Sequence, residues 1–298
     1  MHSSNFIRGA GRPLRLSRIG DRFVARTGIL ELMDELGAAL AGRSDLRMLG
    51  GGNPAHIPAV EAVWRRRMVE LLAEGDAFER MLAHYDAPNG QPEFTEALAR
   101  ALRRRFGWKL TARHIAVTNG SQNAFFYLFN LIAGETADGR RRRILLPMTP
   151  EYIGYADVGV GGDVFVSGRP RIELRGRHDF KYHIDFETLP LNDDIAAIAL
   201  SRPSNPTGNV VSDREIRRLA ALAAERGIPL IVDGAYGLPF PDIIFSNAQP
   251  LWDRNVILVF SLSKLGLPGV RTGIVVAEPR WIRLVSATMA RLWAFVIA

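Results

Sequence analysis

Two serines and a lysine lie directly after an apolar run that predicts a buried strand. The run is Val-Ile-Leu-Val-Phe at residues 256–260, and Ser261, Ser263 and Lys264 follow it. Strand ends in open α/β sheets are where ligands bind, and a partly desolvated lysine can form a Schiff base with an aldehyde. Two hydroxyls and the nearby Arg271 would suit a phosphate. An aldehyde and a phosphate together indicate pyridoxal phosphate, although these residues alone fit a solvated, serine-rich loop more simply.

A second predicted strand, residues 229–233, ends on a carboxylate. Asp233 is the last residue of this apolar run, and Tyr236 lies three positions further on. A buried carboxylate without a partner is costly, so Asp233 needs a cation, and a protonated pyridine nitrogen is one. Taken singly, Asp233 could instead cap a turn, and Tyr236 could be an ordinary half-buried tyrosine.

Two further strand ends carry polar residues. Gly120, Ser121 and Gln122 follow a predicted strand at residues 114–118 and open an apolar helix, whose N-terminal N–H groups suit a phosphate. Asn205 lies in the loop Ser-Arg-Pro-Ser-Asn-Pro-Thr-Gly at residues 201–208, which follows another predicted strand. Ser121 could be only a helix cap and the Asn205 loop only a turn.

The remaining pattern alternates strands with helices. Apolar runs predict strands at residues 114–118, 144–146, 164–166, 195–200, 229–233, 256–260 and 273–276. Helical spacing or capping signals predict helices at residues 28–41, 57–74, 92–106, 123–133, from Thr149 onward, and 212–226. In the helix at 57–74 we expect Ile57, Val60, Val63, Trp64, Met68, Leu71 and Leu72 to face inward. Such alternation predicts an α/β fold, with a mostly parallel sheet that has helices on both faces.

Composition excludes several classes of protein. The 298 residues contain no cysteine, which excludes disulfides, thiol nucleophiles and cysteine-ligated metals and fits a reducing, cytoplasmic location. The net charge is +7, but the arginines are scattered and no nucleic-acid-binding motif occurs, so we expect no nucleic-acid partner. No apolar run is long enough to span a membrane. The six histidines lack metal-ligand spacing, so we expect no metal.

Taken in order along the chain, these motifs resemble one family. The sequence is similar to the class I/II aminotransferases, which are fold-type-I pyridoxal-phosphate enzymes. The resemblance is carried by Tyr85-Asp-Ala-Pro-Asn-Gly, Asn119-Gly-Ser-Gln, Pro150-Glu-Tyr152, Arg202-Pro-Ser-Asn-Pro-Thr-Gly, Asp233-Gly-Ala-Tyr236 and Ser261-Leu-Ser-Lys264 with Arg271. It covers most of the chain.

The resemblance implies a role for each matched residue. Lys264 would hold the cofactor as an internal aldimine and move the substrate's α-proton, and Asp233 would keep the pyridine nitrogen protonated. Tyr236 and Asn205 would hydrogen-bond the ring's phenolic oxygen, and Tyr152 would stack on the ring. The implied phosphate ligands are Gly120, Ser121, Gln122, Ser261, Ser263 and Arg271, with Tyr85 reaching the phosphate of a neighbouring subunit. Gly52 and Asn205 would lie near the substrate carboxylate.

The resemblance also implies an activity and a domain organisation. We expect ping-pong transamination between a small aliphatic amino acid, of the valine or alanine type, and a 2-oxo acid such as pyruvate, catalysed by a homodimer. Residues 1–55 would contribute to a small domain, 56–280 would form the large cofactor-binding domain, and 281–298 would begin a connecting helix. We expect the remainder of the small domain to be absent from this sequence. Two alternatives stay open: a lyase of the same fold, and a fragment that binds the cofactor without turnover.

Overall fold

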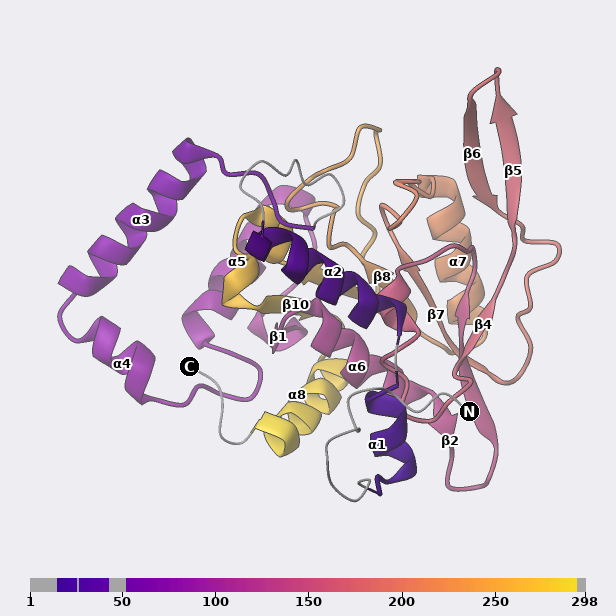
Figure 1. The fold of residues 1–298 in the computed structure, drawn as a ribbon, viewed down its shortest axis with the longest axis horizontal. Helices are drawn as coiled ribbons and strands as arrows, with labels where there is room; N and C mark the ends of the chain where they lie inside the picture. Colours follow the sequence, from indigo (N-terminus) through magenta and orange to yellow (C-terminus); the bar gives the residue numbers. More distant parts are fainter. Residues whose placement is uncertain (1–14, 26, 43–51, 294–298) are drawn as a thin grey trace.

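A mixed sheet forms the centre of the molecule (Figure 1). The computed structural model describes residues 15–25, 27–42 and 52–293. The sheet contains β1 (Ile115–Asn119), β2 (Gly134–Glu135), β3 (Arg141–Leu146), β4 (Phe165–Ser167), β7 (Ile195–Ser201), β8 (Leu230–Asp233), β9 (Val256–Ser261) and β10 (Thr272–Val276). Its order is β1-β10-β9-β8-β7-β3-β2, with β4 also paired to β3. Strands β4, β3, β7, β8 and β9 are parallel, whereas β10 runs antiparallel to both of its neighbours.

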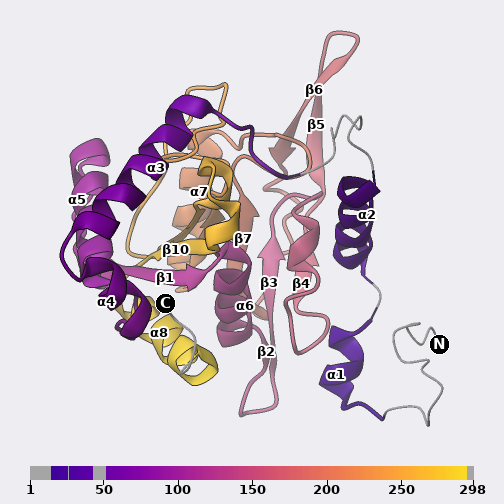
Figure 2. The same cartoon turned by 60° about the vertical axis from the view of Figure 1, so that its left-hand side comes forward.

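Helices cover both faces of this sheet (Figures 1 and 2). They are α1 (Arg18–Phe23), α2 (Gly28–Gly42), α3 (Pro58–Ala73), α4 (Ala77–Ala83), α5 (Pro92–Phe106), α6 (Ser121–Ile132), α7 (Asp213–Glu225) and α8 (Pro279–Trp293). Side chains of β9 alternate between two cores: Leu258 and Phe260 pack with α5 and α7, while Ile257 and Val259 pack with α6 and α8. The predicted α/β fold, with helices on both faces of a mostly parallel sheet, is therefore confirmed.

Most predicted elements form where the pattern placed them. Each of the seven apolar runs forms a strand whose ends differ from the prediction by at most three residues. The helix predicted at 92–106 is α5, and the capping box of Ser212 and Glu215 opens α7 with both reciprocal hydrogen bonds present.

Two predictions about helices are wrong. No α-helix starts at Thr149: its hydroxyl donates to the Gly168 carbonyl oxygen over 3.1 Å, and only a 3₁₀ turn, η3 (Ile153–Tyr155), follows. The helix predicted at 57–74 exists as α3, but none of its residues is buried, and Met68 and Leu72 are among its exposed side chains. Helical spacing establishes that an apolar face exists, but it does not reveal what covers that face.

A two-stranded hairpin, β5 (Pro170–Arg175) and β6 (Asp179–Ile184), was not predicted. It projects from the sheet (Figure 1), and Leu174 at its outer end is 79% exposed. His183 connects the hairpin to α7, because its ring nitrogens lie 2.6 Å from a Glu173 oxygen and 3.1 Å from a Glu215 oxygen. Within the described part of the chain, no helix is long and apolar enough to cross a bilayer.

Candidate active site

The polar residues singled out in the sequence gather at one edge of the sheet. Ser201, Asp233 and Ser261 end three adjacent parallel strands, and Ser201 is the register partner of Asp233. Asn119 ends β1 opposite Thr272, the first residue of β10, so the loop after β1 opens at the same edge. Parallel strands therefore bring together side chains that are far apart in the sequence.

Asp233 is a buried carboxylate that lacks a cationic partner. It is 7% exposed, and it accepts hydrogen bonds from the Tyr155 hydroxyl (2.7 Å) and the Ala235 N–H (2.9 Å). No described lysine, arginine or histidine forms an ion pair with it. Burial raises the pKa of Asp233 to about 6, against the lowering effect of these two hydrogen bonds. Such a carboxylate would gain most from a cation placed against it.

Lys264 lies in the 3₁₀ turn after β9, half-buried beside this carboxylate edge. Its Nζ donates to the carbonyl oxygen of Gly52 and lies 5.5 Å from the centre of the Tyr236 ring. Burial, and secondarily the positive charge of Arg271, lower the pKa of Lys264. A larger fraction of this amine is therefore neutral and nucleophilic than in a solvated lysine.

Arg271, Ser263 and the start of α6 form a group of anion-binding donors. The Arg271 guanidinium lies 3.4 Å from the Ser263 hydroxyl oxygen, and a Cβ added at Gly120 would come within 2.5 Å of that guanidinium. Gly120 has a φ of 86°, which only glycine adopts readily, and it caps α6. The first N–H groups of a helix have no intrahelical partner, so Ser121 offers its amide to an anion there.

Two of the predicted phosphate ligands use their side chains within the protein. The Gln122 amide nitrogen donates to the Gly154 carbonyl oxygen over 2.9 Å, which leaves its backbone N–H at the helix start. The buried Ser261 hydroxyl accepts the Ser263 N–H at 3.1 Å and so shapes the turn that carries Lys264.

Three predicted ring-binding residues surround Asp233 and Lys264. Tyr152 and Tyr236 are both half-buried, and burial raises the pKa of each, with the charge of Asp233 adding to the effect. Both tyrosines therefore keep their hydroxyl protons at neutral pH. Asn205 is half-buried in the loop after β7, where its N–H donates to the Ser201 hydroxyl oxygen over 3.3 Å.

Gly52 lies in this site, whereas Tyr85 contacts none of its described residues. Gly52 lies against Lys264, since a Cβ added to it would be 2.8 Å from Nζ. A larger residue at position 52 would therefore displace the amine. Tyr85 is 72% exposed and touches none of the other candidate residues through a described hydrogen bond or ring contact. The structure thus brings together every candidate residue except Tyr85.

Two site residues were missed in the sequence. Tyr155 is 1% exposed and its hydroxyl donates to Asp233, while Phe125 and Phe129 pack against its ring. The Glu151 carboxylate accepts both the N–H and the hydroxyl of Ser201, and burial raises its pKa to about 8. The motif Pro-Glu-Tyr at residues 150–152 predicted a role for Tyr152 but none for Glu151 or Tyr155.

Comparisons with known proteins agree with this arrangement of fold and site. The family described as aminotransferase class I and II matches residues 63–296, so the chain belongs to that family. It is 50% identical over 273 residues to valine–pyruvate aminotransferase of Escherichia coli K12. It resembles the crystal structure of a putative amino-acid aminotransferase from Psychrobacter arcticum 273-4 (TM-score 0.89, 46% identity) and that of valine–pyruvate aminotransferase from Salmonella typhimurium LT2 (TM-score 0.77, 47% identity).

These matches cover most of this chain but only part of the relatives. The E. coli alignment includes 92% of this chain and 65% of the relative. The two structural matches include 94% and 90% of this chain, and 68% and 65% of the respective relatives. The chain thus spans about two thirds of the length of the aminotransferases it resembles.

Proposed function

We propose that this chain is a pyridoxal-phosphate-dependent aminotransferase. The observation that carries the proposal is the pairing of two groups at adjacent strand ends: a lysine with a lowered pKa after β9, and a buried carboxylate without a cation at the end of β8. Pyridoxal phosphate presents an aldehyde to the first and a pyridine nitrogen to the second. The 50% identity to an aminotransferase supports the same conclusion.

The residues present fit this cofactor. Asp233 is a buried acceptor that still needs a positive charge, as a protonated ring nitrogen would supply. Gly120 leaves room beside the Arg271 guanidinium that a side chain would fill, which suits a phosphate bound there. The proposed phosphate ligands are Gly120, Ser121, Gln122, Ser261, Ser263 and Arg271.

Each ring-facing residue has a defined task in this proposal. When bound, the cofactor supplies an electron-withdrawing pyridinium ring that stabilises negative charge at the substrate Cα. Asp233 would keep the ring nitrogen protonated, and Tyr152 would stack on the ring. Tyr236 and Asn205 would donate hydrogen bonds to the ring's phenolic oxygen, and the raised pKa of Tyr236 keeps it a donor.

Lys264 carries the proton that transamination must move. Its Nζ is the amine that would hold the cofactor aldehyde, and an incoming amino acid would free it. The free amine would be the base that takes the proton from the substrate Cα and the acid that returns it, and the lowered pKa of Lys264 favours the neutral form that the first role requires. Exchange of the amino group between an amino acid and a 2-oxo acid would need this proton transfer once in each direction.

We propose a small aliphatic amino acid, of the valine or alanine type, and a 2-oxo acid such as pyruvate as substrates. The E. coli and S. typhimurium relatives are named for valine and pyruvate. The family resemblance assigns Gly52 and Asn205 to the substrate carboxylate. Gly52 lies against the lysine amine, and Asn205 follows β7, which pairs with the Asp233 strand β8.

A homodimer is part of the proposal. In Figure 1, α3 and α4 stand out from the rest of the molecule. We use the term α3–α4 face for the exposed apolar side chains of these two helices. These side chains are Val63, Met68, Val69, Leu72, Met81 and Leu82. Tyr85 follows this face and is also exposed, as it must be to reach the phosphate of a second subunit. The division into a large domain at 56–280, with 1–55 and 281–298 outside it, stays a prediction.

The test is the visible absorption spectrum of the purified chain with added pyridoxal phosphate, recorded before and after addition of valine or alanine. We expect a visible band typical of a pyridoxal Schiff base, and its loss on addition of the amino acid. Lys264→Ala should abolish the band, whereas the control Lys109→Ala, which removes an exposed lysine, should retain it. A band that ignores amino acids would favour the non-catalytic alternative, and products without an exchanged amino group would favour a lyase.

A further inference from the structure

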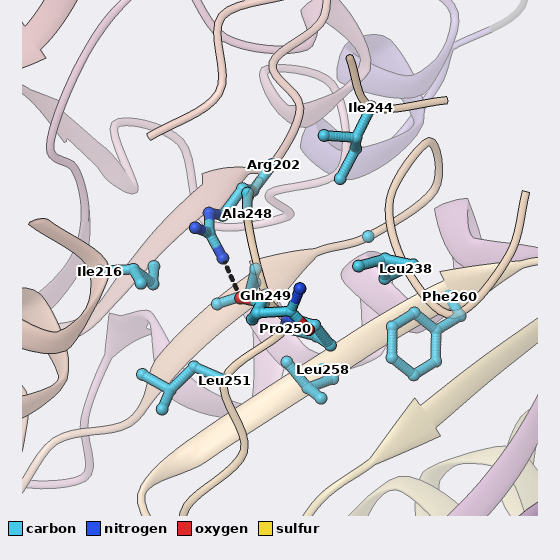
Figure 3. A pocket seen from close by; sticks show the side chains of 12 residues that line it. Arg202, Ile216, Leu238, Ile244, Ala248, Gln249, Pro250, Leu251, Leu258 and Phe260 are labelled. Carbon is cyan, nitrogen blue, oxygen red and sulfur yellow. Dashed lines mark hydrogen bonds between the residues drawn. The ribbon is translucent and has the colours of Figure 1, made fainter. Parts of the chain in front are cut away.

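Arg202 is a buried arginine that the proposed chemistry does not use. It is 6% exposed, although arginine is almost never fully buried unless it is paired. Figure 3 shows its guanidinium directed at the loop that runs from residue 238 to 251, with a hydrogen bond to Gln249. The surrounding side chains Ile216, Leu251 and Leu258 are apolar, so the buried charge depends on its ion pair with Asp213 and on the hydrogen bonds that the guanidinium makes.

The guanidinium binds three groups on two segments, residues 211–213 and the loop at Gln249. Its Nε donates to the Val211 carbonyl oxygen over 2.7 Å, at the far end of the loop that contains Asn205. One terminal nitrogen donates to the Gln249 carbonyl oxygen and the other to Asp213 Oδ1, each over 2.5 Å. The Gln249 N–H donates to the same Asp213 oxygen at 3.1 Å, which closes the arrangement. We call Arg202, Val211, Asp213 and Gln249 the Arg202 clamp.

The backbone of Arg202 contacts the residues on either side of Tyr236. Its N–H donates to the Asp233 carbonyl oxygen over 2.8 Å. Its own carbonyl oxygen lies against Gly237, where an added Cβ would be only 2.7 Å away. Arg202 therefore touches the segment that carries Tyr236 with its backbone and the continuation of that segment, at Gln249, with its side chain.

Asn205 and Tyr236 thus lie on two loops that are both hydrogen-bonded to the Arg202 guanidinium. The Asn205 loop begins at Arg202 and returns to the guanidinium at Val211. The loop after β8 leaves Tyr236 and returns to the guanidinium at Gln249. A lysine could not make these contacts, because a single ammonium lacks the planar fork that reaches a carboxylate and two carbonyls at once.

We propose that Arg202 is a positioning residue that fixes Asn205 and Tyr236 relative to each other, so that both donate to the same oxygen of the ring. This inference rests on the proposed function, since it assigns a purpose to the distance between the two residues that bind that oxygen.

The test compares Arg202→Lys and Arg202→Met with a matched control. Arg217→Met is the control, because Arg217 pairs with the other oxygen of the same Asp213 at 3.8 Å but is 63% exposed. If neither Arg202 variant folds, Asp213→Asn removes the charge that the clamp binds and keeps an acceptor for the Gln249 N–H.

The first readout needs no cofactor. In hydrogen–deuterium exchange, the Ser204 amide, bonded to Asn209, and the Ile243 amide, bonded to Tyr236, should exchange about tenfold faster or more in the Arg202 variants. A tenfold factor corresponds to losing one charge-assisted hydrogen bond. The Ile144 amide, which is in β3 and bonded to Val164, belongs to neither loop and should not change, and Arg217→Met should leave all three amides as they are.

The second readout is the pH midpoint of the visible band of bound pyridoxal phosphate. Donation by Asn205 and Tyr236 favours the state in which the ring oxygen is charged, so loss of the clamp should raise the midpoint by about one unit. Every variant keeps the titratable groups that surround Asp233 and Lys264, which are Glu151, Tyr152, Tyr155, Tyr236 and Arg271.

The outcomes separate this inference from the proposed function. Faster exchange together with an unchanged midpoint would overturn it, because Arg202 would then stabilise the loops without positioning the two donors. Unchanged exchange would overturn it as well. If the unmodified chain gives no visible band, the proposed function fails, and the exchange comparison still decides whether Arg202 holds the two loops.

Discussion

The Tyr155 hydroxyl donates a 2.7 Å hydrogen bond to Oδ2 of Asp233, and this bond connects η3 to the end of β8. Both side chains are buried, so neither can replace the other with water. Burial raises the pKa of Tyr155 well above its ordinary value, which keeps its hydroxyl a donor at every pH at which the fold is stable. The carboxylate is thereby held in one orientation, with Oδ1 on the Ala235 N–H.

Tyr155→Phe tests what this hydroxyl contributes. The variant keeps the aromatic packing against Phe125 but leaves one Asp233 oxygen buried without a donor. We expect the free energy of unfolding to fall by about 1–3 kcal/mol at pH 8, where Asp233 is ionised. The loss should be smaller at pH 5, where Asp233 is mostly protonated. Urea unfolding at both pH values measures it, with Tyr182→Phe as the control. Equal losses at the two pH values would contradict a role that depends on the Asp233 charge.

Asp233→Asn should raise the stability of the cofactor-free chain and weaken its binding of pyridoxal phosphate. The pKa of Asp233 is about 6 in the folded chain against an ordinary 3.8, so between these pH values the folded chain keeps a proton that the unfolded chain has released. Stability therefore falls as the pH rises through this window, by about 3 kcal/mol in total. Asparagine removes this dependence, so the cofactor-free variant should melt at a higher temperature than the unmodified chain at pH 8.

The same substitution should weaken binding of pyridoxal phosphate by about tenfold or more, since the ring nitrogen loses its anionic partner. Thermal melts and equilibrium titration measure the two effects, with Asp193→Asn, which changes an exposed carboxylate, as the control. A variant that is more stable and binds the cofactor equally well would argue against Asp233 as the partner of the ring nitrogen.

Glu151→Gln should flatten the pH dependence of stability in a different window. The pKa of Glu151 is about 8 in the folded chain and 4.5 ordinarily, so its contribution to stability is lost as the pH rises through this range, at most about 1.4 kcal/mol per unit. Glutamine does not titrate, and its amide oxygen can still accept from Ser201. Melting temperatures from pH 6 to 9 should fall less steeply in the variant than in the unmodified chain. Glu187→Gln, an exposed substitution, should not change the slope.

The strand ends could be predicted because apolar runs of three to six residues, bounded by turn-forming residues, are typical of buried strands in an α/β fold. Asp233 and Lys264 follow such runs, so their convergence at one sheet edge could be predicted from the chain order alone. Tyr155 and Glu151 could not be predicted in the same way. Their partners lie 78 and 50 residues away, and the segment between β3 and β4 has no periodicity to show which way its side chains point.

The contacts of the Arg202 clamp could not be predicted from the sequence either. The position of Arg202 in the motif Arg-Pro-Ser-Asn-Pro-Thr-Gly is evident in the sequence, but Gln249 is 47 residues further along the chain. Nothing local indicates that an arginine beside a polar loop is buried among apolar side chains. Sequence reasoning finds residues that carry chemistry by their type, whereas it finds positioning residues only where they are close neighbours in the chain.

The α3–α4 face leads to the last prediction. Leu72 on α3 is 58% exposed, although the helical spacing predicted that it faces inward, and Val69 on α3 and Leu82 on α4 are 61% and 58% exposed. A second copy of the chain that covers this face would bury these side chains and bring Tyr85 toward the partner's site. Leu72→Glu replaces one of these exposed apolar side chains with a charge and should weaken dimerisation by about thirtyfold or more, equivalent to about 2 kcal/mol.

Sedimentation velocity at micromolar concentrations measures this change. Leu174→Glu is the matched control, because Leu174 is more exposed than Leu72 but lies on the β5–β6 hairpin, away from the α3–α4 face. We expect the unmodified chain and Leu174→Glu to be dimers and Leu72→Glu to be largely monomeric. A dimer that Leu174→Glu disrupts and Leu72→Glu leaves intact would place the interface on the hairpin, and Tyr85 could then not reach the neighbouring site in the proposed way.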